Sequence, residues 1–176
     1  MAVDSAQPAP SGGPEGGLKA VDMVENSQTF RAAIDLPDLD ATARLGTAIA
    51  AGLRAGDVVA LWGDLGAGKT TLARAILRAL GVTEDVPSPT FTIVQSYDTA
   101  RFAVAHYDLY RLKSAREMRE LGFDEALEDG VALVEWPERA PEALPPEALH
   151  VRLAPALTGR TARLTGPARW ENFLHV

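Results

Sequence analysis

A glycine-rich stretch that ends in lysine and threonine is the part of this sequence best suited to chemistry. It reads Gly63-Asp64-Leu65-Gly66-Ala67-Gly68-Lys69-Thr70, the pattern G-x-x-x-x-G-K-T of a phosphate-binding loop. The glycines let backbone N–H groups turn toward a polyphosphate, and the N-terminus of a following helix adds partial positive charge. The lysine of this pattern reaches the β- and γ-phosphates, and the threonine hydroxyl binds Mg²⁺. The stretch therefore predicts a site for a nucleoside triphosphate and Mg²⁺.

Two other apolar runs end in a carboxylate. Glu135 follows the run 130–134, and Asp108 follows the run 101–107. Because ligands bind at the carboxyl ends of parallel strands, an acid at such an end faces the metal ion or the attacking water. Glu135 follows the more apolar run, so we expect it to be the acid that binds the metal, with Asp108 near the phosphates.

The segment between the glycine-rich stretch and Asp108 has two interpretations. Residues 88–92, between and after two prolines, would lie near the γ-phosphate with Thr90 or Thr92 as a switch-like hydroxyl, or would be a proline-stiffened connection. His106 is interpreted as a core or surface histidine rather than a catalytic one. The three histidines of the chain lack metal-ligand spacing, so a zinc site is not expected.

The elements that must position these groups follow from hydrophobic periodicity. A short apolar strand over 57–62 and a helix over 71–81 flank the glycine-rich stretch. Another helix precedes them, capped by Asp38 or Asp40 and extending to Leu53. Strands are predicted over 29–34, 91–97, 101–112, 130–135, 150–153 and 161–165, and short helices over 114–121 and 123–128. This order predicts an α/β, three-layer P-loop NTPase-like sandwich whose central parallel strands are extended by antiparallel edge strands.

Composition limits the classes of function. The 176 residues are enough for one domain, which we place at 29–176 after an acidic, Pro- and Gly-rich disordered tail over 1–28. The net charge of -7 argues against DNA binding and against direct binding of RNA. No apolar run is long enough for a membrane span, and the N-terminus lacks a signal-peptide pattern. We expect a cytoplasmic protein, and the lack of cysteine agrees with that compartment.

Several motifs together resemble those of the bacterial TsaE (YjeE) family. The resemblance runs from about residue 34 to 165 and is carried by the glycine-rich stretch and by Leu36-Pro37-Asp38, Ser88-Pro89-Thr90-Phe91-Thr92, His106-Tyr107-Asp108-Leu109-Tyr110-Arg111-Leu112 and Val134-Glu135-Trp136-Pro137-Glu138-Arg139. It implies a small P-loop ATPase, weak alone, that acts on TsaB and TsaD in forming threonylcarbamoyladenosine at position 37 of tRNA. The resemblance implies that the protein would contact tRNA only indirectly, through that complex.

The resemblance also implies roles for individual residues. Thr70 and Glu135 would bind Mg²⁺, and Lys69, Asp108 and Glu135 would form the catalytic set. The residues expected to border ATP are Leu39, Thr42, Gly63, Asp64, Leu65, Gly66, Ala67, Gly68, Lys69, Thr70, Thr71, Thr90, Asp108 and Arg160.

Three alternatives use the same nucleotide site. A small-molecule or nucleoside kinase would need an acceptor pocket and a lid with arginines, for which the segment 111–119 is the candidate. A GTPase switch is disfavoured because the chain has neither N-K-x-D nor D-x-x-G. A nucleotide-gated assembly factor would need ATP binding but not hydrolysis.

Overall fold

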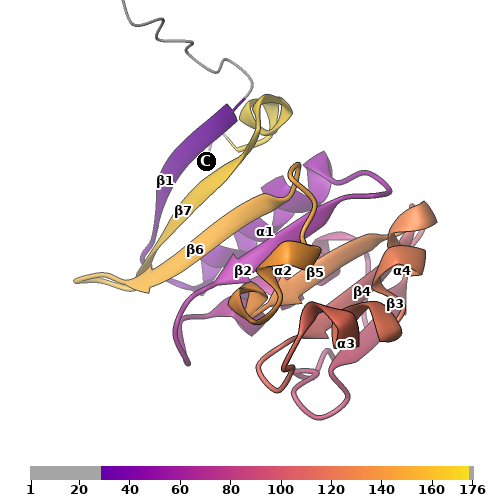
Figure 1. The fold of residues 1–176 in the computed structure, drawn as a ribbon. Helices are drawn as coiled ribbons and strands as arrows, with labels where there is room; N and C mark the ends of the chain where they lie inside the picture. Colours follow the sequence, from indigo (N-terminus) through magenta and orange to yellow (C-terminus); the bar gives the residue numbers. More distant parts are fainter. Residues whose placement is uncertain (1–28, 175–176) are drawn as a thin grey trace, which may run out of the picture.

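The strand and helix predicted on either side of the glycine-rich stretch are at the centre of the fold. β2 spans Val58–Trp62 and α2 spans Lys69–Ala79 (Figure 1). α2 begins two residues before the predicted start, so Lys69 and Thr70 lie in its first turn. Every residue of β2 except Trp62 is buried, as expected for a strand that is covered on both faces.

In the computed structural model, which describes residues 29–174, seven strands form one sheet in the order β1-β7-β6-β2-β5-β4-β3. β2 pairs in parallel with β5 and β6, and β4 pairs in parallel with β5. The pairs β1–β7, β6–β7 and β3–β4 are antiparallel. The other strands are β1 (Thr29–Leu36), β3 (Val94–Asp98), β4 (Ala103–Asp108), β5 (Val131–Glu135), β6 (Leu149–Pro155) and β7 (Arg160–Pro167). The predicted tail over 1–28 lies outside the described residues.

The sheet separates two apolar cores because successive side chains of a strand point to opposite faces. Val59 and Leu61 of β2 belong to the core shared with α1 and α2, whereas Val58 belongs to the core shared with α3 and α4. The helices are α1 (Leu39–Gly52), α3 (Ala115–Glu120) and α4 (Phe123–Asp129), with 3₁₀ turns η1 (Pro137–Arg139), η2 (Pro141–Ala143) and η3 (Ala168–Asn172). The predicted three-layer α/β sandwich is confirmed.

Helix α1 fixes the position of α2. Asp38 is its N-cap, with Oδ1 accepting a hydrogen bond from the N–H of Ala41 at 2.8 Å. Gly46 lies where the two helices meet, and a Cβ added to it would lie 2.5 Å from Cβ of Ala75. The close approach of the helices therefore requires glycine at this position.

Two predicted strands differ from the observed ones. β3 begins at Val94 rather than Phe91, because Phe91 and Thr92 lie in a turn closed by a hydrogen bond from the Ile93 N–H to the Pro89 carbonyl at 2.6 Å. The strand predicted over 101–112 ends at Asp108. The short helices over 115–120 and 123–129 lie where the sequence predicts them.

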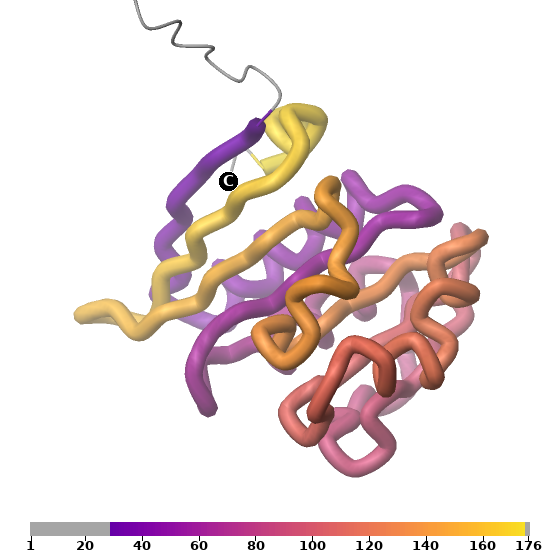
Figure 2. The backbone as a smooth tube through the Cα atoms, viewed as in Figure 1, coloured from indigo at the N-terminus to yellow at the C-terminus, as the bar shows by residue number. Residues whose placement is uncertain are grey.

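The ends of the described chain lie together at one edge of the sheet. Figure 2 shows the first strand beside the last one, and the register pairs Thr29 with Pro167. β1 is therefore one edge strand of the sheet, with β3 at the other edge, and the antiparallel pair β6–β7 lies inside the sheet next to β1. Between residues 29 and 174 there is no helix of the length and apolarity needed to cross a membrane.

Candidate functional site

A cavity lies at the carboxyl ends of β2, β4 and β5, over the start of α2. The strands β4 and β5 end at the same level, since their register pairs Asp108 with Glu135. The residues that line the cavity are Leu65, Gly66, Gly68, Lys69, Thr70, Thr71, Ser88, Thr90, Asp108, Tyr110, Glu135, Trp136 and Arg160.

The backbone of the glycine-rich loop depends on glycine at two positions. Gly63 and Gly68 have φ of 143° and 104°, in the region that favours glycine. A Cβ on Gly63 would lie 2.6 Å from the carbonyl oxygen of Leu153. Gly68 is the N-cap of α2 and supplies no side-chain cap, so the first N–H groups of this helix are available to an anion.

Lys69 is buried beside the loop, with 4% of its surface exposed. Its Nζ donates hydrogen bonds to the carbonyl oxygens of Gly63 at 2.5 Å and Asp64 at 3.0 Å, and lies 3.7 Å from the ring centroid of Trp136. Burial lowers the pKa of the Lys69 ammonium, and the nearby carboxylates, Glu135 first among them, act in the opposite direction. The Lys69 ammonium thus lies in the wall of the cavity, in contact with two backbone carbonyls and the face of the Trp136 ring.

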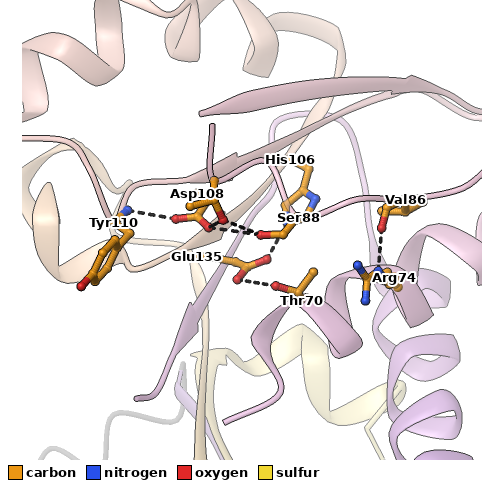
Figure 3. A network of polar contacts seen from close by, with 9 residues as sticks. Thr70, Arg74, Val86, Ser88, His106, Asp108, Tyr110 and Glu135 are labelled. Atoms are coloured by element: carbon orange, nitrogen blue, oxygen red, sulfur yellow. Dashed lines mark hydrogen bonds and ion pairs between the residues drawn. The ribbon is translucent and has the colours of Figure 1, made fainter. Parts of the chain in front are cut away.

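Glu135 joins the start of α2 to the interior of the sheet (Figure 3). Its Oε2 accepts a hydrogen bond from the Thr70 hydroxyl at 2.9 Å, and its Oε1 lies 2.8 Å from Nε2 of His106. Both His106 and Glu135 are buried, with 0% and 2% of their surface exposed. Nδ1 of His106 has no hydrogen-bond partner within residues 29–174. Nε2 is the ring nitrogen that donates to the Glu135 carboxylate, because a proton on Nδ1 would be a buried donor without an acceptor.

The hydroxyl of Thr70 and the carboxylate of Glu135 fit Mg²⁺. Both are hard oxygen donors, and Mg²⁺ in nucleotide sites takes one or two protein oxygens and completes its shell with phosphate and water. Within the described part of the chain, no group of three or more His, Cys, Asp or Glu residues is placed to hold a metal ion by itself. The two oxygen donors thus fit an ion that would be held together with a nucleotide.

Asp108 holds the segment that precedes β3. Its Oδ2 accepts hydrogen bonds from the Thr90 hydroxyl at 3.0 Å and the Ser88 hydroxyl at 3.4 Å, and its Oδ1 accepts one from the Tyr110 N–H at 3.0 Å. Arg74 of α2 donates from Nε to the Val86 carbonyl at 2.6 Å, so the same segment is also tied to the helix (Figure 3). The turn after Pro89 thus brings Thr90 to the cavity.

Most of the predicted nucleotide-binding residues meet at this place. Asp64 and Ala67 line a second hollow with Leu65, Gly66 and Arg160, and Arg160 donates to the Gly66 carbonyl at 3.1 Å. Leu39 and Thr42 line neither hollow. Leu39 is 69% exposed, and the Thr42 hydroxyl donates to the Asp38 carbonyl. Their contact with a nucleotide stays a prediction. The segment 111–119, proposed above as a kinase lid, contributes no residue to the cavity.

Three residues of the site were not assigned a role by the sequence. Trp136 and Tyr110 form part of the cavity wall and contact each other, with ring centroids 4.9 Å apart. Trp136 has φ of 57°, in the left-handed region, which turns the chain sharply after Glu135. His106 was interpreted as structural, and it contacts Glu135 directly. The signal for all three was their position within two residues of a predicted acid.

Comparison with known proteins agrees with this architecture. The family model described as threonylcarbamoyl adenosine biosynthesis protein TsaE matches residues 36–162, most of the chain. The chain belongs to the TsaE family. That match contains every residue that lines the cavity.

Two relatives named tRNA threonylcarbamoyladenosine biosynthesis protein TsaE are similar to this TsaE-family chain. The protein from Rickettsia felis is 45% identical over 113 residues, which cover 64% of this chain and 66% of that protein. The protein from Bacillus subtilis is 45% identical over 103 residues, which cover 58% of this chain and 64% of that protein. The match thus spans about two thirds of the length of these relatives. The crystal structure of Bacillus subtilis YdiB superposes with a TM-score of 0.63 at 32% identity, covering 83% of this chain and 89% of that one.

Proposed function

We propose that this chain is the ATP-binding, slowly ATP-hydrolysing member of the machinery that forms threonylcarbamoyladenosine at position 37 of tRNA, and that it acts on the TsaB–TsaD complex. The observation that carries the proposal is the hydrogen bond between Thr70 and Glu135 at 2.9 Å, beside Lys69 and at the N-terminus of α2. Membership of the TsaE family and the names of the relatives support the same role.

Different residues of the cavity have different roles in phosphoryl transfer to water. The N–H groups at the start of α2 bind the β- and γ-phosphates, and Lys69 leaves the carbonyls of Gly63 and Asp64 to offset their charge. Thr70 and Glu135 would hold Mg²⁺, which would neutralise negative charge on the phosphates. Asp108 relays the presence of the γ-phosphate to the segment that carries Ser88 and Thr90. Catalysis here is positioning plus electrostatic stabilisation.

ATP hydrolysis by the purified chain, alone and with TsaB and TsaD added, tests this function. We expect slow hydrolysis by the chain alone, an increase with both partners, and loss of activity in Lys69→Ala. A rate of ATP hydrolysis that does not change when TsaB and TsaD are added would contradict the assignment to this pathway. Full ATP binding and turnover in Lys69→Ala would contradict the nucleotide site itself.

A Glu135→Gln variant separates hydrolysis from binding. The amide keeps the shape of the side chain and removes the negative charge that binds Mg²⁺, so ATP binding should persist while turnover falls. If formation of threonylcarbamoyladenosine with TsaB, TsaD and tRNA continues at the normal rate in this variant, the chain acts through nucleotide binding alone.

A further inference from the structure

Three arginines lie on the face of the sheet opposite α1, on the strands β1, β6 and β7. Arg31, Arg152 and Arg163 are exposed and alternate along their strands with residues buried against α1. Figure 1 shows these strands extending beyond α3 and α4, which cover the other half of the same face. The three arginines are absent from the lining of the nucleotide cavity, so this surface, the arginine face, is separate from it.

Two of these arginines are direct neighbours. The register of β6 and β7 pairs Arg152 with Arg163, and like charges placed directly opposite in an antiparallel pair repel each other. None of the three forms an ion pair with an acid among residues 29–174. The acid on these strands is Asp35. It lies opposite Thr161 in the register of β1 and β7, and its Oδ1 accepts a hydrogen bond from the Thr161 hydroxyl. The positive charge of the arginine face is therefore left for an anion from outside.

The Arg152 guanidinium is held ready for such an anion. It stacks over Trp62 at 4.2 Å from the ring centroid, and the Trp62 ring is fixed in turn by a hydrogen bond from Nε1 to Nδ1 of His150 at 3.1 Å. Stacking engages the flat side of a guanidinium and leaves its N–H donors in the free plane, where they match a carboxylate. Arg152 thus loses little conformational freedom on binding a carboxylate.

A shallow hollow lies over the paired strands β1 and β7 on the arginine face. Arg31 and Arg163 line it together with the small side chains of Ala33 and Thr165. The small residues leave room for a backbone, and the arginines flank it. This shape fits an extended chain whose acidic side chains reach the guanidinium groups.

We propose that the arginine face binds an extended acidic segment of a partner protein. A carboxylate-bearing segment would neutralise the repelling pair Arg152 and Arg163 and lie over the hollow beside Arg31. Nucleic acid is disfavoured because the rest of the molecule brings the net charge to -7, which repels a long polyanion. Because none of the three arginines lines the nucleotide cavity, we expect the interaction without a nucleotide.

Binding of a fluorescent peptide in which Glu alternates with Thr tests the proposal at low salt, with the full-length chain. Glutamates at alternate positions point to one side of an extended peptide, toward the arginines. We expect saturable binding that weakens with salt and that weakens at least about tenfold, or 1.4 kcal/mol, in the variant Arg31→Gln, Arg152→Gln, Arg163→Gln. The matched control is Arg44→Gln, Arg116→Gln, Arg119→Gln, which removes three exposed charges from helices.

Each of the other outcomes overturns the proposal. Equal loss in the control variant would mean that only net charge matters. Equal binding of a peptide with Gln in place of Glu would remove the role of carboxylates. Tighter binding of an oligoadenylate that is lost in the first variant would make the occupant RNA. Peptide binding that appears only after Glu15, Asp22 and Glu25 are changed to amides would make the occupant the N-terminal segment of this chain.

Discussion

The carboxylate of Glu135 is held from both sides by residues of different elements. Thr70 contacts one oxygen from α2, and His106 contacts the other from β4. Loss of either donor would leave one carboxylate oxygen of Glu135 without its partner and free the side chain to reorient. A side chain that orients a metal-binding carboxylate affects activity by about 10- to 100-fold when it is removed.

His106→Ala should therefore lower kcat for ATP hydrolysis by about 10- to 100-fold and raise the Mg²⁺ concentration needed for half-maximal rate. ATP binding should change much less, because His106 does not line the cavity. His106→Gln is the matched variant, since its amide nitrogen can donate from nearly the position of Nε2. Equal impairment of the Ala and Gln variants would show that His106 only fills space.

The hydroxyl of Thr90 distinguishes the two interpretations of residues 88–92. Thr90 donates to Asp108, whereas Thr92 is exposed in the turn. Thr90→Val removes the hydrogen bond and should lower the hydrolysis rate by about fivefold to tenfold, the kinetic equivalent of about 1 kcal/mol. Thr92→Val should have the wild-type rate. Steady-state rates of the two variants decide whether the segment is a γ-phosphate sensor or a stiff connection.

At the scale of elements, α1 and α2 touch through a glycine. Replacing Gly46 by alanine normally stabilises a helix by up to about 1 kcal/mol, but here the new Cβ would overlap Ala75. We expect Gly46→Ala to lower the free energy of unfolding by about 1–3 kcal/mol, the range for overpacking. Urea unfolding measures it, with Ala51→Gly on the exposed face as a control for helix propensity alone. Stabilisation by Gly46→Ala would show that the helices separate at little cost.

Elements whose signals are local were predictable from the sequence. The strand, glycine-rich loop and helix around Lys69 are specified by residues close together in the chain. The same is true of the N-cap of α1 by Asp38. The start of β3 was not predictable in this way. Phe91, Thr92 and Ile93 favour a strand by propensity, but the bond from Ile93 to Pro89 and the contact of Thr90 with Asp108 hold a turn instead. Asp108, which holds Thr90 in this turn, lies 18 residues further along the chain, so no pattern within residues 89–93 reveals it.

At the scale of the whole molecule, the same limit applies to strand order and to His106. Periodicity identified the strands at either end of the domain, but nothing within either segment says that Thr29 pairs with Pro167. The contact of His106 with Glu135 depends on the pairing of β4 with β5. The cluster of carboxylates was predictable because parallel strands end at one edge of the sheet.

The stability of the whole fold should depend on pH through His150. Burial, and then the charge of Arg152, lower its pKa below the ordinary 6.5. Below pH 6.5 the unfolded chain binds a proton that the folded chain does not yet accept, so the free energy of unfolding decreases as pH falls from 6.5 through the lowered pKa. Above 6.5 this group has no effect.

Urea unfolding between about pH 5 and pH 8 measures this dependence in the wild type and in His150→Gln, which retains a hydrogen-bond acceptor for Trp62. The variant should lose less stability on acidification. An identical pH profile in the two proteins would show that His150 does not titrate differently in the folded and unfolded chains.

The pairing of β1 with β7 has a consequence for folding during synthesis on the ribosome. β1 is synthesised before the other strands of this sheet, and β7, its partner on the sheet, is synthesised after them. Until then Ile34 and Leu36, which are buried in the finished core, have no strand beside them. The same late hairpin brings Arg160 to the glycine-rich loop. A nascent chain can thus complete this sheet and the candidate cavity only after β7 has been synthesised.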